Sequence, residues 1–408
     1  MRSKLLPTLM LILAFLSSLT LHLLLFSYSQ LKEAIRLEMQ LSYAEVGFIF
    51  SISVLALILF RIPWGLVIDR LGFRTSLGIA LTLIGVFGVL RGFANNYAIL
   101  LLFQLFLGIG FAAIIPSMSK IASAWFPPQK TGFAIGVAIS GFAVGDIIGL
   151  SATPYLLTWL NGWRNVFFVY GFWALILMCL WWVLAKENQD VHSVPKANPN
   201  SSVTKNFKAL LGMKQLWLLT GLYLCASVCY DTFLLWLPSI LDSEGVQLNT
   251  AGLITSMLPL GFIFASFVIG SLSDRAGLRK PFILVLGLAS GPVVYAAGTL
   301  QGPAVWFFAF ALGLCSIGVL TLAITIPVEH PQTAMFVGSA VSIISSIGNL
   351  GSFLMPTVVG QIKDVTGSFF WSVLILAVFG ELMLLLGLPL TETGRKKNRL
   401  NGLAAAHK

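Results

Sequence analysis

The first candidate for chemistry in this chain is an arginine within an apolar run. Arg61 lies in the stretch FRIPWG, residues 60–65. A guanidinium keeps its charge at physiological pH, and a charge in hydrocarbon is costly unless a carboxylate, carbonyl oxygens or an anionic ligand surrounds it. Two interpretations follow. Arg61 binds an anion, or it forms a buried ion pair or extends its head group toward water.

Further ionisable side chains stand in apolar runs. Histidine changes its charge near neutral pH, so His22 could relay protons, although packing between helices is the more ordinary role. Asp146 and Asp231 are candidates for binding a coupling proton, and Asp231 could equally pair with a local neighbour. We interpret Glu381 as structural, or as protonated and shielded from lipid.

Uncharged polar residues complete the set of candidate substrate contacts. Beside Arg61 and His22 these are Tyr28, Ser140, Tyr230 and Asn349. Small polar residues also simply let helices approach closely. The same alternative holds for other polar residues of the second half, namely Thr321, Thr325, Ser342, Ser345 and Ser346.

The elements that must position these residues are transmembrane helices. The 408 residues are 57% hydrophobic and 10% charged, whereas soluble domains carry about a quarter charged residues. A helix needs about 20 apolar residues to cross the hydrocarbon layer, and backbone groups in lipid must be paired within the helix. We count twelve such runs, at approximately 8–29, 44–68, 75–93, 97–122, 132–155, 165–185, 214–240, 250–273, 281–299, 304–327, 334–358 and 369–390.

The basic residues predict how these spans are oriented. With both termini in the cytoplasm, most of the 25 Lys and Arg residues fall in cytoplasmic segments, as the positive-inside rule requires. The net charge of +10 is therefore attributed to loops and not to a nucleic-acid surface. The outside segments hold Lys32, Arg36, Arg91, Arg164 and Lys363.

The chain contains an internal repeat. The segment GLVIDRLGFR at residues 65–74 recurs as GSLSDRAGLR at residues 270–279, 205 residues later. Gly47 and Gly252, and likewise Gly162 and Gly367, share this offset, which indicates duplication. We predict a six-helix bundle at 1–185, a polar cytoplasmic linker at 186–213, a second bundle at 214–394 and a cytoplasmic tail at 395–408.

Several kinds of chemistry have no support in the sequence. Cys179, Cys225, Cys229 and Cys315 lie in apolar runs, and no His or carboxylate near them completes a metal set. There is no hydrolytic triad and no nucleotide-binding loop, so we expect neither an enzyme nor a cofactor. We expect the energy for any transport to come from an ion or solute gradient.

The duplicated loop is similar to that of the major facilitator superfamily of secondary transporters, whose motif is G-x-x-x-D-R-x-G-x-R. The resemblance covers nearly the whole chain and implies an all-α membrane protein with twelve helices in two pseudo-symmetric bundles around a central site. It also implies a conformational latch, with topology anchoring as the alternative. The residues of this gating motif are Gly65, Asp69, Arg70, Gly72, Arg74, Gly270, Asp274, Arg275, Gly277 and Arg279.

Resemblances to particular branches of the superfamily narrow the range of expected substrates. Arg61 resembles the second-helix arginine of nitrate/nitrite porters, but the repeat places Ser266 where their second arginine would be. Oxalate and monocarboxylate transporters look similar around WFP at residues 125–127. An exporter motif on the fifth helix is broken because Asp146 replaces its proline, and Gln104 replaces the fourth-helix arginine of many proton-coupled members.

We therefore expect a secondary transporter for a small organic anion, such as a carboxylate, with a proton or another ion as a possible coupling partner. The alternatives are efflux of amphipathic cations and a non-transporting membrane sensor. We expect a monomer among membrane lipids in a bacterial-type inner membrane, and no nucleic-acid partner.

Overall fold

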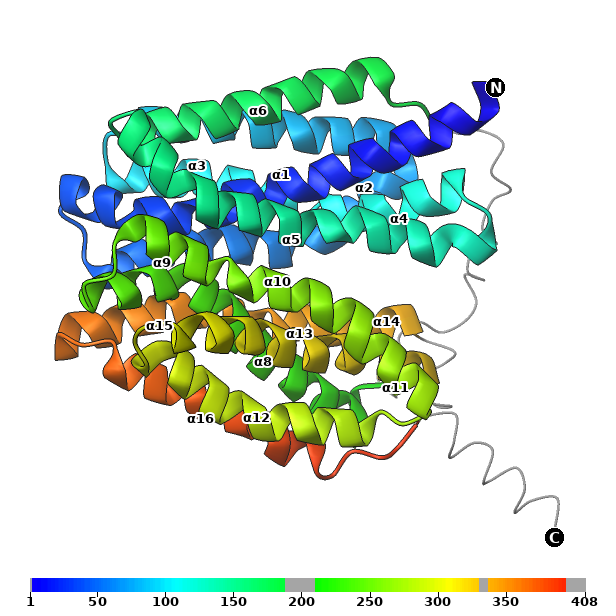
Figure 1. Ribbon diagram of the computed structural model, residues 1–408. Coiled ribbons are helices and arrows are strands. Elements are labelled where there is room, and N and C mark those ends of the chain that lie inside the picture. Colours follow the sequence, from blue (N-terminus) through cyan, green and yellow to red (C-terminus); the bar gives the residue numbers. More distant parts are fainter. Residues whose placement is uncertain (1, 188–209, 330–336, 394–408) are drawn as a thin grey trace, which may run out of the picture. The chain divides into compact units, whose positions relative to one another are not determined.

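The described part of the protein is built from helices. The computed structural model describes residues 2–187, 210–329 and 337–393 (Figure 1). Most of the predicted linker at 186–213, and the predicted tail at 395–408, lie outside these residues. The first half contains α1 (Arg2–Met39), α2 (Tyr43–Leu90), the 3₁₀ turn η1 (Arg91–Phe93), α3 (Tyr97–Phe111), α4 (Ile114–Trp125), α5 (Pro128–Trp159) and α6 (Trp163–Leu184).

The second half follows the same plan with more breaks. Its described elements are α8 (Lys214–Ser243), α9 (Leu248–Thr255), α10 (Met257–Phe264), the π-helical turn η2 (Ala265–Ile269), α11 (Gly270–Ala276), α12 (Lys280–Thr299), α13 (Ala304–Glu329), α14 (Val337–Gly348), α15 (Leu350–Thr366) and α16 (Phe370–Gly387).

The described residues form eleven helical stretches that are long and apolar enough to cross a membrane. One of them, Tyr43–Phe93, has 51 residues. A straight helix of that length would be more than twice as long as the hydrocarbon layer of about 30 Å is thick. The stretch is broken at Gly72, whose φ of 79° and ψ of 164° lie outside the helical region. It therefore accounts for two crossings, and the twelve predicted spans are accounted for.

Glycine is needed at the corresponding point of the second half. Gly277 ends α11 in the left-handed conformation, with φ of 65° and ψ of 28°. Its backbone N–H donates to the carbonyls of Ser273 and Asp274. A residue with a Cβ is disfavoured there, so both repeated motifs use glycine to reverse the chain between helices.

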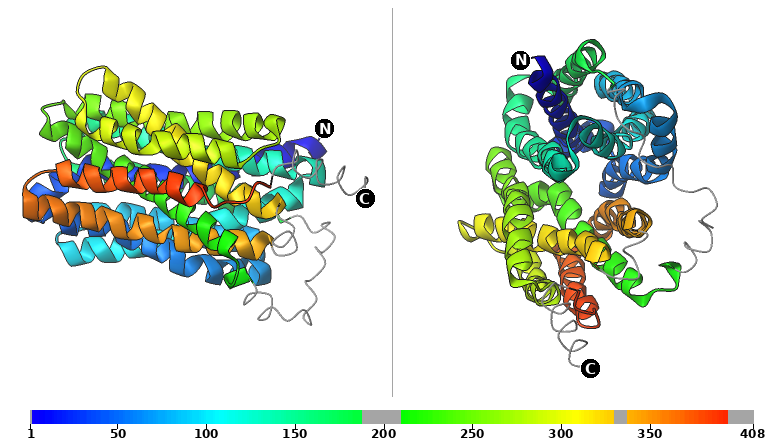
Figure 2. Two further views of the ribbon diagram at one scale, coloured as in Figure 1. Left: turned by 90° about the horizontal axis from the view of Figure 1, so that it is seen from below. Right: turned by 90° about the vertical axis from the view of Figure 1, so that its right-hand side faces the viewer.

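The chain divides into two compact units. Unit 1 consists of Met1–Val194, Gly245–Ser256 and Pro356–Asp364, and unit 2 consists of Pro195–Glu244, Met257–Met355 and Val365–Lys408. Within unit 1, α1 packs along α5, while α2 packs along α3 and α6 (Figure 2). Within unit 2, α12 packs along α16 and α10 packs along α13. The domain boundaries predicted from the sequence remain a prediction.

Candidate functional site

The site in unit 1 depends on close packing between α1 and α5. Gly141, Gly145 and Gly149 repeat every fourth residue on α5, so they lie on one face of the helix. A Cβ at Gly141 would collide with the carbonyl oxygen of Phe15, and one at Gly145 with that of Leu19. Small residues of this kind allow helix backbones in a membrane to approach closely. This glycine stripe holds α1 against α5.

The glycine stripe brings His22 and Asp146 together. The Nδ1 atom of His22 lies 2.8 Å from Oδ1 of Asp146, and the two residues are 124 positions apart in the sequence. The Asp146 side chain is 1% exposed and that of His22 is 19% exposed. Of the two partners, therefore, the imidazole is the one that a proton or a solute can reach.

Aromatic rings surround this histidine. The His22 ring stacks on Phe142 with 4.3 Å between centroids and lies 5.5 Å from the ring of Phe26. A protonated imidazole would form an ion pair with Asp146, whereas a neutral one forms a hydrogen bond. The contact between His22 and Asp146 is therefore compatible with either form of the imidazole.

Arg61 is the second ionisable group of unit 1 that the sequence singled out. It lies on α2 between the capped start of the helix and the break at Gly72, and it is half-buried. Nearby, the indole Nε1 of Trp64 donates to the carbonyl of Ile109 at 2.7 Å, which ties this part of α2 to α3. The guanidinium is therefore held on a fixed helix within a membrane-spanning segment.

The two hydroxyl candidates of unit 1 both donate to backbone carbonyls. Tyr28 is fully buried, and its hydroxyl donates to the carbonyl of Val46 at 2.8 Å. The hydroxyl of Ser140 donates to the carbonyl of Val137, one turn earlier on α5, at 2.7 Å. Tyr28 joins α1 to the start of α2 in this conformation.

The candidates from the second half lie in unit 2. The hydroxyl of Ser352 donates to Oδ2 of Asp231 at 2.6 Å, which joins α15 to α8. Tyr230 is buried with its ring 6.2 Å from that of Phe262. Asn349 is the single residue between α14 and α15, where the helix is interrupted. The bond between Ser352 and Asp231 pairs a coupling candidate with a residue that the sequence did not single out.

Two basic residues that the topology argument assigned to outside segments are buried. Lys32 is 2% exposed and its Nζ donates to the carbonyl of Ser29 at 2.7 Å. Arg91 is fully buried, and one of its Nη atoms lies 3.1 Å from the carbonyl of Leu24 and 3.3 Å from Oε1 of Gln104. The sequence did contain a sign of this for Arg91, because the predicted apolar run 75–93 includes that residue.

The gating motif of the first half is held by charges and by helix ends. Asp69 forms an exposed ion pair with Lys120 at 2.7 Å. Arg74 donates to the carbonyls of Ala185 and Trp182 at 2.6 and 3.1 Å, at the carboxyl end of α6 where a cation is favoured. The carboxylate of Glu187 accepts from the backbone N–H groups of Phe73 and Arg74.

The last arginine of the motif is more buried in the second half, at Arg279, than in the first half, at Arg74. The Arg279 guanidinium contacts Asp274 at 2.5 Å, Glu329 at 2.6 Å and the Ser273 hydroxyl at 2.7 Å. The hydrogen bond with Glu329 raises the pKa of Arg279, although burial opposes this shift. The guanidinium therefore stays charged at every physiological pH.

A further element of the repeat follows from these contacts. Glu392 accepts from the backbone N–H groups of Arg279 and Lys280 at 2.8 and 3.0 Å, where α12 begins. Glu187, which has the matching role in the first half, lies 205 residues earlier. The duplication thus includes an acidic cap that follows the last helix of each half.

No group of three or more His, Cys, Asp or Glu side chains suited to a metal ion occurs among the described residues.

Comparisons with known proteins agree with this picture. The sequence profile of the Major Facilitator Superfamily matches residues 10–335 and 245–407. The chain is similar to a probable sulfoacetate transporter of Cupriavidus necator (26% identity over 82% of each chain). It is also similar to a hexuronate transporter of Bacillus subtilis (25% identity, covering 85% of this chain and 86% of the other).

A solved structure has the same fold. A bacterial homologue of the human lysosomal transporter Spinster, crystallised in an inward-facing and unoccupied conformation, superposes with a TM-score of 0.74 at 19% identity over 93% of each chain. The predicted all-α membrane fold is confirmed.

Proposed function

The chain belongs to the Major Facilitator Superfamily of membrane transporters, and we propose that it carries a small organic anion, in particular a carboxylate, by alternating access. It is a multi-pass membrane transporter and not an enzyme. The observation that supports the anion best is Arg61, a permanent cation held half-buried within a membrane-spanning helix. The names of two relatives, which specify sulfoacetate and hexuronate, agree with an anionic cargo.

Arginine suits this role because of its shape as well as its charge. The guanidinium presents N–H donors in a planar fork that matches a carboxylate or sulfonate. Such a group recognises the acid while leaving the remainder of the solute to hydroxyl and aromatic contacts. Among the candidate residues, Ser140, Tyr230 and Asn349 are the proposed polar contacts, and Tyr28 could join them only by releasing the carbonyl of Val46.

His22 and Asp146 form the proposed coupling group. Anion uptake against a membrane potential that is negative inside is unfavourable unless a cation accompanies the anion. A proton bound at the reachable imidazole would supply that charge, and the buried carboxylate would stabilise it. In unit 2, we propose Asp231 as the residue that binds a coupling proton.

The test is uptake of labelled hexuronate and sulfoacetate by purified protein in liposomes. We expect Arg61→Ala to lower uptake about 10- to 100-fold, because a hydrogen bond to a charged group contributes about 1.5–3 kcal/mol. Arg61→Lys keeps the charge but loses the fork, so its uptake should be intermediate. The exposed Lys130, replaced by alanine, is the matched control. Uptake by Arg61→Ala at the level of that control would remove Arg61 from the site.

A further inference from the structure

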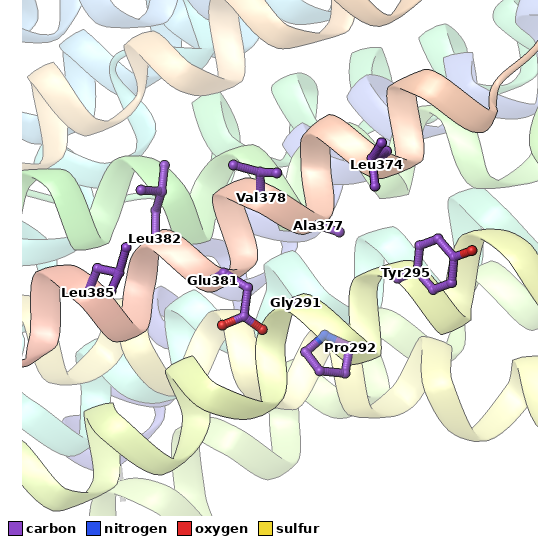
Figure 3. A pocket seen from close by; sticks show the side chains of 9 residues that line it. All are labelled: Gly291, Pro292, Tyr295, Leu374, Ala377, Val378, Glu381, Leu382 and Leu385. Carbon is purple, nitrogen blue, oxygen red and sulfur yellow. The ribbon is translucent and has the colours of Figure 1, made fainter.

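A groove runs along one flank of unit 2, between α12 and α16. Its volume is about 380 Å³. Glu381 of α16 points across the groove toward Gly291 and Pro292 of α12, and the Tyr295 ring lies further along the same helix (Figure 3). The remaining lining is apolar and comes from α16, namely Leu374, Ala377, Val378, Leu382 and Leu385.

This groove opens on the face of unit 2 that meets lipid. On α16, Leu374, Val378 and Leu385 are exposed, and Glu381 shares their helix face because it lies seven and three residues after the first two and four residues before the third. Tyr295 is likewise exposed on α12. Exposed apolar residues on a membrane-spanning helix face the acyl chains. Solutes dissolved in the bilayer therefore reach the groove directly.

In the described part of the chain, the carboxyl group of Glu381 has no protein partner. Within residues 2–187, 210–329 and 337–393, it makes no hydrogen bond and no ion pair. Next to it, Pro292 has no N–H to donate to the Leu288 carbonyl four residues earlier in α12. The groove thus offers a carboxyl group beside a helix turn that lacks a donor, and both features call for a ligand that donates hydrogen bonds.

The floor of the groove is a tight helix crossing. A Cβ added to Gly380 would lie 2.7 Å from the backbone nitrogen of Gly291, and one added to Gly291 would collide with the Glu381 side chain. Gly287 similarly approaches the backbone of α16. The carboxyl group is therefore held against α12 and cannot withdraw into the interior of unit 2.

The duplication supplies an internal comparison. A groove of the same volume, about 380 Å³, lies along α6 of unit 1. Ile176 is one of its lining residues and stands 205 positions before Glu381, so it is the repeat counterpart of that glutamate. A carboxyl group is consequently not needed to build such a groove, and its presence in unit 2 requires a separate reason.

We propose that the groove between α12 and α16 binds an amphipathic amine that enters from the bilayer. The ammonium group donates its N–H bonds to the Glu381 carboxylate and neutralises it. Without the amine, the carboxyl group must either carry a lone charge in lipid, which is costly, or hold a proton. The apolar body lies along Leu374, Val378 and Leu385, and Tyr295 offers a ring face to the cation. Apolar lining with a single charged group is typical of small-molecule sites. This site is independent of the anion pathway.

The test uses dicyclohexylcarbodiimide, an apolar reagent that reacts with protonated carboxyl groups in membranes. The carboxyl adds across one C=N bond and the product rearranges to a stable N-acylurea, with no leaving group. Protein in lipid nanodiscs is treated with the reagent, and the adduct is located by peptide mass spectrometry. We expect labelling at Glu381, none at that site in Glu381→Gln, and little at Asp146, which is buried and paired with His22.

Dodecylamine and dodecanol then separate the possible occupants. We expect saturating dodecylamine to lower labelling of Glu381 at least about tenfold, which corresponds to about 1.4 kcal/mol, while dodecanol has little effect. In Ile176→Glu, the groove of unit 1 should gain a labelled and amine-protected site.

Three results would overturn the proposal: no labelling at Glu381, equal protection by dodecanol, or protection that depends on protein concentration. They would indicate an inaccessible carboxyl, an acyl chain as the occupant, and a second copy of the chain, respectively.

Discussion

In the proposed mechanism, a single proton on His22 changes the charge that unit 1 presents to a solute. Asp146 is almost fully buried, so its negative charge is compensated from inside the protein, and the imidazole is its identified charge partner at 2.8 Å. When that imidazole is protonated the pair is neutral, and when it is not the pair carries one negative charge. An incoming anion is repelled by the second state and tolerated by the first, which is the physical basis of coupling proposed here.

The residue-scale prediction separates coupling from binding. In Asp146→Asn and His22→Gln we expect proton-driven accumulation of the labelled anion to fall at least about tenfold, a change of about 1.4 kcal/mol, while exchange between equal pools of substrate continues. Counterflow and gradient-driven uptake, measured in the same liposomes, provide the two readouts. The control is Ser151→Ala, because the Ser151 hydroxyl donates within α5 to the Ile147 carbonyl. Accumulation that persists in both variants would contradict the coupling role.

At the scale of the element, the positions of the glycines in α5 determine where α1 can pack closely against it. Gly145 faces α1 at a contact too close for a side chain, whereas Gly136 on the same helix has nothing within 4 Å of an added Cβ. The same substitution should therefore act in opposite directions at the two positions. An alanine in an open helical position is favoured over glycine by about 1 kcal/mol, and one in a closed contact forces the helices apart.

The prediction concerns this pair of alanine variants. Gly136→Ala should keep or raise the thermal unfolding temperature and leave uptake unchanged. Gly145→Ala should destabilise the protein by about 1–3 kcal/mol and impair coupled uptake, because it separates His22 from Asp146. Thermal unfolding in detergent and liposome uptake measure the two effects. Equal behaviour of the variants would show that the contact between α1 and α5 does not position the pair.

At the scale of the whole molecule, the two halves share a plan but distribute charge differently. Both use a glutamate after the last helix as an acidic cap, Glu187 in the first half and Glu392 in the second. The partners of the motif aspartates differ, however. Asp69 pairs with the exposed Lys120, whereas Asp274, itself exposed, pairs with the buried Arg279. The repeat has therefore kept the positive φ of its motif glycine and its acidic cap, while its ion pairs diverged.

This asymmetry predicts unequal effects on stability. Glu329→Gln should cost about 3 kcal/mol, because it leaves the buried Arg279 guanidinium short of its main partner. Asp69→Asn should cost less than about 1 kcal/mol, since exposed ion pairs contribute little. Because the pKa of Arg279 is raised, its charge persists even above the ordinary arginine pKa, so the difference should not change between pH 6 and pH 8. Thermal unfolding at both pH values checks this, and similar losses in the two variants would refute it.

Local composition determined the architecture. Apolar runs of about 20 residues must become membrane-spanning helices, since the backbone finds no other hydrogen-bond partners in lipid, and one offset of 205 residues placed them in two halves. The family could be recognised from the motif at residues 65–74 and its copy. Arg61, His22, Asp146 and Asp231 were identifiable individually, because an ionisable residue in an apolar run is visible without knowing its neighbours.

Tertiary structure alone decided which of these groups meet. His22 and Asp146 pair across 124 residues because a glycine stripe on α5 accepts α1, and helix-to-helix contacts of this kind leave no signal within either segment. The burial of Arg91 and the groove at Glu381 likewise depend on which faces of distant helices come together. Hydrophobicity acts locally and fixes the spans, whereas the pairing of charges depends on shape complementarity between helices far apart in the chain.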